Sequence, residues 1–276
     1  MSKNNTKIIS VVNQKGGVGK TTTVMNLGAV LAAIDKRVLV IDLDPQGNSS
    51  TGLGIDLHKR NKSIYDVIIN EDDISESIFE TKVPNLDVIP STMDLAAAEF
   101  DLANLSKREH KLKESLLHLK GDYDYVFIDC PPSLGLLTIN ALTASHSIII
   151  PLQCEFFALE GLTSLLDTAD RIKDKFNASL EIDGIILTMH DKRNKLTSQI
   201  EKDARDCLGK MIYKTVVPRN VRLSEAPSYG IPAILYASSC SGSVAYMDLA
   251  EEMIKRNKRS NKKWVKIDWA RAYLHY

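Results

Sequence analysis

The chain is poor in cysteine and has no long apolar run. Only four of its 276 residues are cysteine, at positions 130, 154, 207 and 240, and none lies at the short paired spacing of a zinc site or a disulfide framework. No segment reaches the ~18 consecutive apolar residues of a membrane-spanning helix. The polar start, residues 1–7, lacks the apolar stretch of an export signal. We therefore expect a cytoplasmic protein that keeps its cysteines reduced.

An excess of either charge is also lacking. The 35 basic residues are matched by 35 acidic ones, which gives a formal net charge of zero. The molecule as a whole is not a polycation, so any contact with nucleic acid has to come from a local patch. At this length the expectation is one α/β domain with a single core.

Short apolar runs alternate with helical stretches along most of the chain. The runs are rich in Ile and Val, as strands buried on both faces are. This alternation predicts an α/β fold with a doubly wound, mostly parallel sheet and helices on both faces. The expected strands are 8–12, 38–43, 86–90, 125–129, 147–152, 182–188, 212–217 and 233–236, and the expected helices are 21–33, 93–119, 161–176, 196–208 and 243–255.

A glycine-rich loop follows the first expected strand and leads into a helix. Glycines at 16, 17 and 19 let backbone N–H groups point inward around a polyphosphate, and the positive end of the helix dipole faces the same anion. In such a loop Lys20 reaches the β and γ phosphates and the hydroxyl of Thr21 holds Mg²⁺. The loop could instead open a dinucleotide fingerprint with Asp42 on the ribose. Thr22 stands where that fingerprint needs its third glycine, so we favour a nucleoside triphosphate.

The loop departs from the usual G-x-x-x-x-G-K-[ST] pattern at two positions. Gln14 replaces the first glycine, and an additional lysine, Lys15, begins the loop. The variant K-G-G-x-G-K-T resembles the deviant Walker A P-loop ATPases of the ParA, MinD and nitrogenase iron protein group. The resemblance implies that Lys15 contacts the nucleotide of a partner subunit in an ATP-sandwich homodimer. It also implies that ATP is held by the loop residues Lys15, Gly16, Gly17, Val18, Gly19, Lys20, Thr21 and Thr22.

Carboxylates end two of the expected strands. Asp129 closes the apolar run Tyr-Val-Phe-Ile-Asp at the sheet edge where an α/β fold gathers its ligands, and we assign it to the Mg²⁺ shell. Asp42 and Asp44 lie one residue apart at the end of another strand, in a run that resembles the D-x-D-P-Q-x-N switch of ParA proteins. The resemblance implies that Asp44 positions the attacking water and that Asp42 lies nearer the metal or the loop. Gln46 is a weaker candidate for the task of Asp44.

The choice of base and the contacts to it depend mainly on the resemblance. No N-K-x-D or T-K-x-D run of GTP-binding proteins is present, which favours adenine. The run from 216 to 230 resembles the ParA segment that packs on the base, which implies contacts from Pro218, Arg219 and Asn220. By itself this run predicts only a turn after a strand. Glu155 matches a family position that touches the ribose of the partner's nucleotide.

The resemblance to ParA proteins spans residues 7–256 through several motifs in the expected order. It implies ATP-dependent dimerisation, binding of duplex DNA without sequence preference on the nucleoid, and ATP hydrolysis stimulated by a ParB-type centromere-binding protein. Arg193 and Arg222 match family positions used for DNA, and other basic residues could extend the patch: Lys192, Lys195 and Arg205. No helix-turn-helix extension precedes the first strand. The iron protein branch is excluded because Cys130 and Cys154 do not lie in its motifs.

Two other functions remain open from the sequence. The first is a membrane-associated positioning ATPase of the MinD type, which the switch sequence and the run from 216 to 230 disfavour. The second is an ATP-dependent ligase of the dethiobiotin or cobyrinate synthase type, for which no acid-recognition motif is evident.

The last twenty residues, 257–276, form a basic, aromatic tail that we separate from the ATPase domain of residues 1–256. This tail could be a helix with an apolar side that binds a membrane interface, an additional DNA contact, or a loosely ordered end. The residues on the apolar side of such a helix would be Val265, Trp269, Ala272, Tyr273 and Tyr276.

Overall fold

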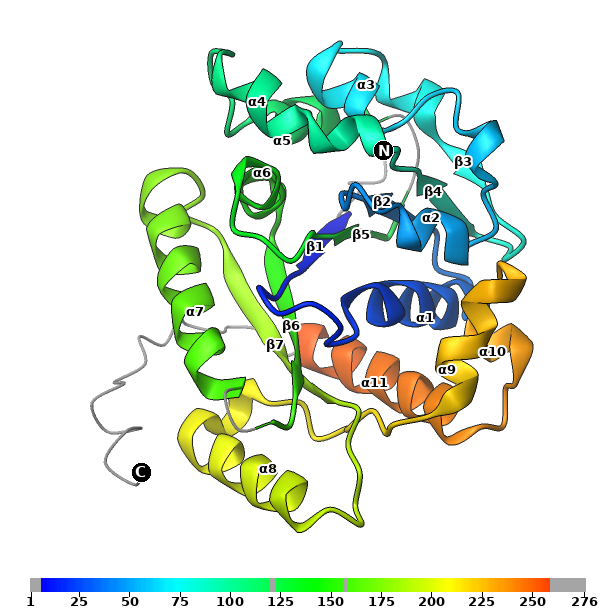
Figure 1. Ribbon diagram of the computed structural model, residues 1–276, viewed down its shortest axis with the longest axis vertical. Helices are drawn as coiled ribbons and strands as arrows, with labels where there is room; N and C mark the ends of the chain where they lie inside the picture. The colour runs from blue at the N-terminus through cyan, green and yellow to red at the C-terminus, as the bar shows by residue number, and fades with distance from the viewer. Residues whose placement is uncertain (1–5, 120–122, 156–157, 259–276) are drawn as a thin grey trace.

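A seven-stranded sheet forms the centre of the molecule (Figure 1). The computed structural model describes residues 6–119, 123–155 and 158–258, so the tail lies outside the described residues except for its first two positions. The strand order is β3-β4-β2-β5-β1-β6-β7; β3 runs antiparallel to β4, and the other neighbours are parallel. The strands are β1 Lys7–Val11, β2 Val38–Asp42, β3 Phe79–Glu80, β4 Leu86–Ile89, β5 Tyr125–Asp129, β6 Ser147–Gln153 and β7 Glu181–Thr188.

Helices cover both faces of this sheet. The helices are α1 Lys20–Ala33, α2 Asn48–Gly52, α3 Ile64–Ile69, α4 Ala98–Ala103, α5 Lys111–Leu116, α6 Leu136–Ala144, α7 Ala158–Lys175, α8 Lys195–Leu208, α9 Val221–Glu225, α10 Ala233–Tyr236 and α11 Ser241–Lys258. One buried cluster joins one face of the strands to α1, α9, α10 and α11. The other joins the opposite face to helices α3 to α8. The doubly wound, mostly parallel fold predicted from the alternation is therefore confirmed.

Alternate residues of each strand enter different clusters, as the period of two in a strand requires. In β1 and β5, Ile9 and Phe127 pack toward α1, whereas Val126 and Ile128 pack toward the other layer. Both sides of these strands are apolar, which is the pattern of a parallel sheet buried on both faces.

Helix α1 is enclosed on all sides. Every residue from Thr23 to Ala32 is buried. The Thr23 and Tyr246 hydroxyls lie 3.1 Å apart and share a hydrogen bond, which ties α1 to α11. On another side, the side-chain oxygen of Asn26, Oδ1, accepts the Ala233 N–H at 2.8 Å and caps the start of α10. The helix that follows the glycine loop is thus fixed by neighbours far away in the sequence.

Two expected strands are wrong. The run 233–236 is the short helix α10, which begins directly after Pro232. Proline suits the start of a helix, because its fixed φ is close to the helical value and the N–H that it lacks would have no partner there. The run 212–217 lies beside β7 but makes only isolated bridges, Ile185 with Ile212 and His190 with Pro218.

One expected helix is also wrong, because the stretch 93–119 is not continuous. It divides into a 3₁₀ turn, Met93–Ala96, followed by α4 and α5. The interruption between α4 and α5 includes Lys107 in a left-handed conformation, with φ at 51°, which a continuous right-handed helix does not tolerate.

Within the described residues, none of the helices has the length and apolar character needed to cross a bilayer. All four cysteines are free in this structure.

Candidate active site

The glycine loop lies between β1 and α1. Gly17 and Gly19 have φ angles of 74° and 91°, in the left-handed region that favours glycine. A Cβ atom added at Gly17 would meet nothing within 4 Å, so backbone conformation and not packing requires glycine at this position. Gly19 caps α1 without any side-chain hydrogen bond to the first turn. The free N–H groups of that turn therefore face the space enclosed by the loop, which suits an anion.

Lys20 is buried at the start of α1, with 7% of its surface exposed. Its ammonium donates one long hydrogen bond, 3.3 Å, to the backbone carbonyl of Lys15. Burial lowers the pKa of Lys20, while the negative charges of Asp129 and Asp44 act to raise it. An ammonium has three donors, so most of its capacity is open to an anion in the loop.

Asp129 lies at the end of β5, beneath the loop. Its Oδ2 accepts hydrogen bonds from the hydroxyls of Thr21 and Ser49, both at 2.7 Å. Its Oδ1 is buried and has no hydrogen-bond partner among the described residues. Burial raises the pKa of this carboxyl, and the nearby charge of Asp42 raises it further. An orphaned carboxylate oxygen beside a threonine hydroxyl is a set of donors that fits Mg²⁺.

Asp42 lies beside Asp129 because their strands pair in register, Asp42 opposite Asp129. The side chain of Asp42 is fully buried and accepts hydrogen bonds from the N–H and hydroxyl of Ser50, at 2.8 and 2.6 Å. Burial raises the pKa of Asp42 as well. Ser49 and Ser50 on α2 therefore hold the two carboxylates, a role that sequence analysis missed; the only signal was their place directly after the switch.

Asp44 begins the turn between β2 and α2. One oxygen, Oδ1, accepts the Gln46 N–H at 3.0 Å, and its backbone carbonyl accepts the N–H of Gly47 at 2.9 Å. The backbone N–H of Asp44 donates to Asp42 at 3.3 Å, so the two predicted carboxylates are adjacent. The other oxygen of Asp44 accepts no hydrogen bond from the described part of the chain.

The predicted base segment lies beside the end of β7. The N–H of Arg219 donates to the His190 carbonyl at 3.1 Å. Asn220 caps α9 through its carbonyl oxygen, which accepts the N–H of Arg222, and its amide donates to the Ser241 hydroxyl at 2.9 Å. The end of β7 also contacts the glycine loop, because the Thr188 hydroxyl donates to the Val18 carbonyl at 2.8 Å.

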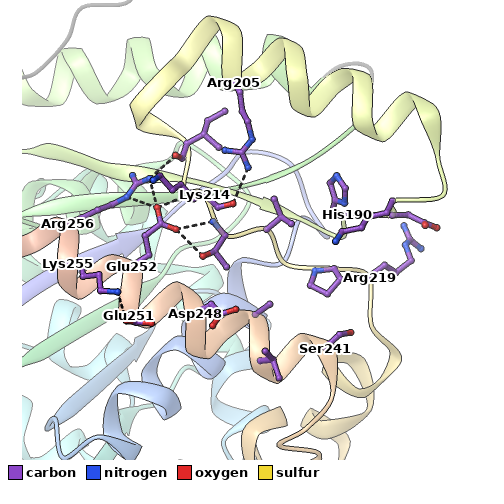
Figure 2. A pocket seen from close by; sticks show the side chains of 18 of the residues that line it. His190, Arg205, Lys214, Arg219, Ser241, Asp248, Glu251, Glu252, Lys255 and Arg256 are labelled. Carbon is purple, nitrogen blue, oxygen red and sulfur yellow. Dashed lines mark hydrogen bonds and ion pairs between the residues drawn. The ribbon is translucent and has the colours of Figure 1, made fainter.

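A groove of about 2000 Å³ lies along this segment. Figure 2 shows it with Arg219 and His190 at one end and Glu252 and Arg256 at the other. None of the residues of the glycine loop lines it. The groove is therefore separate from the glycine loop, although Pro218 and Arg219 of the predicted base segment line it.

Lys15 turns away from its own loop. Its ammonium pairs with the Glu155 carboxylate, from the connection between β6 and α7, and both side chains are about half exposed, 50% and 43%. The N–H of Lys15 donates to the side chain of Asn13 at 3.0 Å. Within one protomer the structure thus joins the two residues that the family resemblance assigns to the partner's nucleotide.

The basic residues expected at DNA differ in their surroundings. Arg193, with a side chain 90% exposed, pairs with Asp191 at 3.0 Å. Arg222, 54% exposed, pairs with Glu225 at 2.7 Å. Lys192 and Lys195 are exposed as well. Arg205 instead donates to Glu201 and to the carbonyls of residues 213 and 214, just before the predicted base segment.

Comparisons with known proteins agree with this site. A family model described as an AAA domain matches residues 6–182. Chromosome partitioning protein ParA of Caulobacter vibrioides (strain NA1000 / CB15N) is 50% identical over 260 residues, which cover 94% of this chain and 97% of that protein. Sporulation initiation inhibitor protein Soj of Bacillus subtilis (strain 168) is 53% identical over 247 residues, which cover 90% and 98%.

A solved structure shares the whole fold. The cobyrinic acid a,c-diamide synthase of Mycobacterium smegmatis, crystallised with ADP and magnesium, superposes with a TM-score of 0.81 at 35% identity. The match covers 95% of this chain and 99% of that one. Identity to the ParA and Soj proteins is higher, at about half of the aligned positions, and extends over nearly their full length. The resemblance found in the sequence is confirmed: the chain belongs to the ParA/Soj family of chromosome-partitioning ATPases.

Proposed function

We propose that this protein is an ATP-driven switch that partitions chromosome or plasmid DNA. It binds ATP with Mg²⁺, dimerises around the nucleotide, binds duplex DNA without sequence preference, and hydrolyses ATP with a ParB-type partner. The observation that carries the proposal is the arrangement at Asp129: one oxygen held by Thr21 and Ser49, and the other buried without a partner, close enough for its charge to act on the buried Lys20.

The residues at the loop suit a magnesium nucleotide. Mg²⁺ keeps several waters and takes most of its other oxygens from phosphates, so one hydroxyl and one carboxylate from the protein suffice. Thr21 and Asp129 would supply these two groups, directly or through water. The absence of a cluster of three or more acidic, His or Cys side chains among the described residues is consistent with such a site. The related synthase of known structure contains ADP and magnesium.

Dimerisation would exchange the contact between Lys15 and Glu155 for contacts to a second copy. Both side chains are about half exposed, and surface ion pairs contribute only about 0–1 kcal/mol. Breaking this ion pair therefore costs little free energy. The new contact of Lys15, with the phosphates of the facing subunit's nucleotide, would be with a more highly charged group. Glu155 would then reach the ribose of the same nucleotide.

Asp44 is the residue that we propose for orienting the attacking water. Its Oδ1 is fixed by the turn at Gln46, which leaves Oδ2 to accept a hydrogen bond from water. Phosphoryl transfer depends mainly on positioning and charge neutralisation. Lys20 would contribute the charge, and Asp44 the position.

DNA binding would involve Arg193 and Arg222, with Lys192 and Lys195 beside Arg193. Each arginine is now paired with an acid on its own segment, and DNA phosphates would replace that acid. Contacts of this kind release counterions, so binding should weaken steeply with salt. The protein would then reside on the nucleoid in the cytoplasm.

The test is the oligomeric state of single variants with ATP and Mg²⁺. Asp44→Ala should accumulate as an ATP-bound dimer, because hydrolysis is blocked after assembly. Lys15→Ala should bind ATP but remain monomeric. Lys36→Ala is the matched control, since Lys36 also forms a surface ion pair, with Asp124, but lies far along the chain from the loop. A monomeric Asp44→Ala protein at micromolar concentration would contradict the proposal.

A ligase is the second candidate, because the synthase from M. smegmatis shares 35% identity with this chain. The two functions differ in what accelerates ATP hydrolysis: duplex DNA with the product of the neighbouring gene for the switch, or a carboxylic acid with an amine donor for the ligase. The MinD-like alternative depends on a tail helix within residues 257–276. That helix lies outside the described residues apart from 257 and 258, and we propose no membrane role.

A further inference from the structure

Arg60 is a buried arginine close to the switch. Only 8% of its surface is exposed, and no carboxylate of the described residues lies within ion-pair distance of it. Burial lowers the pKa of Arg60, while the more distant charges of Asp42 and Asp56 act to raise it. A buried charge normally requires a close partner of opposite sign, because removing it from water is costly.

The guanidinium of Arg60 is satisfied by neutral oxygens instead. Nε and Nη2 donate to the Ile55 carbonyl at 3.2 and 2.8 Å, and Nη2 also donates to the Thr51 hydroxyl at 2.7 Å. Nη1 donates to the carbonyl of Ser91 at 2.9 Å and, at 3.5 Å, to that of Gly47. All five N–H groups of the side chain are thus engaged, and they join the end of β4 to both ends of α2.

Helix α2 depends on such a connection. It has five residues, and a helix this short is not stable by itself. Its N-cap, Gly47, has a φ of 62°, and a Cβ atom there would lie 2.4 Å from Nη1 of Arg60. The Thr51 hydroxyl that accepts from Arg60 donates in turn to the Gly47 carbonyl at 3.0 Å. The guanidinium therefore packs directly against the first turn of α2.

The same helix holds the carboxylates of the site. Ser49 donates to Asp129, and Ser50 donates to Asp42. The hydroxyl of Ser50 also accepts the N–H of Ser91 at 3.0 Å, which completes a chain of hydrogen bonds from Arg60 through Ser91 and Ser50 to Asp42. On the other side, Gly47 donates its N–H to the carbonyl of Asp44.

We propose that Arg60 is a positioning residue for ATP hydrolysis. It touches neither the glycine loop nor the reacting atoms; it fixes α2 and the turn before it, and through them the position of Asp44 relative to Asp129. This inference rests on the proposed role of Asp44. A positioning role explains why the charge of Arg60 is buried against neutral carbonyls. The planar guanidinium has five donors in a fixed arrangement and joins three backbone segments in one geometry, which a lysine ammonium cannot reproduce.

The test is the effect of Arg60→Lys and Arg60→Met on affinity and on turnover. Affinity for a fluorescent ATP analogue should stay within about two-fold, because the glycine loop is untouched. Single-turnover hydrolysis with Mg²⁺ and duplex DNA should fall at least about ten-fold, since small misplacements of a positioning group have effects of that size. Arg108→Lys is the matched control: its guanidinium also donates to a backbone carbonyl, that of Ala103, and hydrolysis should remain within about two-fold of wild type.

Two further variants separate the possible failures. Gly47→Ala intrudes on the guanidinium without removing it, so it should also lower hydrolysis while affinity is retained, even if Arg60 variants do not fold. Asp44→Asn, measured in parallel, tests the proposed function itself. If Asp44→Asn loses hydrolysis but folded Arg60→Lys and Gly47→Ala hydrolyse ATP at the wild-type rate, Arg60 is only structural. If Asp44→Asn hydrolyses ATP at the wild-type rate, the proposed role of Asp44 is wrong, and the inference about Arg60 that rests on it is wrong as well.

Discussion

Replacement of Glu252 by glutamine should destabilise the protein strongly, although the side chain is on a surface helix. Figure 2 shows its carboxylate between α11 and the segment beside β7. It accepts the N–H groups of Lys214 and Thr215, both at 2.9 Å, and the Thr215 hydroxyl at 3.0 Å. It also accepts two bonds from Arg256, at 3.0 and 2.8 Å. Only 16% of the side chain is exposed.

The magnitude follows from these contacts. Oε2 accepts both bonds from Thr215, and Oε1 accepts those from Lys214 and Arg256. A glutamine with its NH₂ group at the Oε2 position leaves the Thr215 N–H facing a donor, while the Thr215 hydroxyl can turn to accept. The bonds to Oε1 then lose the carboxylate charge. Together these changes cost about 3 kcal/mol, since a hydrogen bond to a charged group contributes about 1.5–3 kcal/mol. For a domain of this size the unfolding midpoint should fall by about 8 °C, at about 2–4 °C per kcal/mol.

The assay is thermal unfolding of the nucleotide-free protein by circular dichroism. Glu251→Gln is the matched control, because among the described residues Glu251 pairs only with Lys255, and its side chain is 65% exposed. The midpoint of this variant should move by no more than about 2 °C. The segment held by Glu252 continues to Pro218, so Glu252→Gln should also weaken ATP binding. Equal shifts for the two variants would refute the reasoning.

Three further outcomes are expected. Burial raises the pKa of Asp42 to about 6 and that of Asp129 to about 7, against 3.8 when exposed. The folded state therefore binds more protons than the unfolded state between these values, and its stability falls as the pH rises through them. Asp129→Asn should flatten the fall in the unfolding midpoint of the nucleotide-free protein between about pH 4 and 7. Gly54→Ala should lower the free energy of unfolding by about 1–3 kcal/mol in denaturant, because Gly54 has a φ of 87° and an added Cβ would lie 2.8 Å from the Gly230 carbonyl oxygen. An unchanged free energy of unfolding would mean that the turns at Gly54 and Gly230 separate easily. Arg222→Glu should dimerise normally but lose DNA retention in a mobility-shift assay at moderate salt, and unchanged retention would remove Arg222 from the patch.

The residues of the candidate phosphate site could be grouped from the sequence because their signals are local. The glycine spacing, Lys20 and Thr21 lie within a few residues, and Asp129 ends an apolar run whose parallel pairing brings it to the same sheet edge. The fold class followed from the alternation of runs. These features need no knowledge of distant contacts.

The parts that could not be predicted depend on distant residues. The segment 212–217 reads as a strand, but Glu252 takes two of its N–H groups and it forms no continuous ladder. The run 233–236 is apolar and short, and such runs do not distinguish a strand from a helical turn. Ser50 and Arg60 are ordinary polar residues in the sequence, and only the approach of Ser91 from β4 gives them a role at the site.

The enclosure of α1 has a consequence for how the molecule can change shape. Each flank of this helix between Thr23 and Ala32 is occupied by protein, so tilting or sliding it would open voids in a close-packed interior. The helix is therefore a stationary reference during the catalytic cycle.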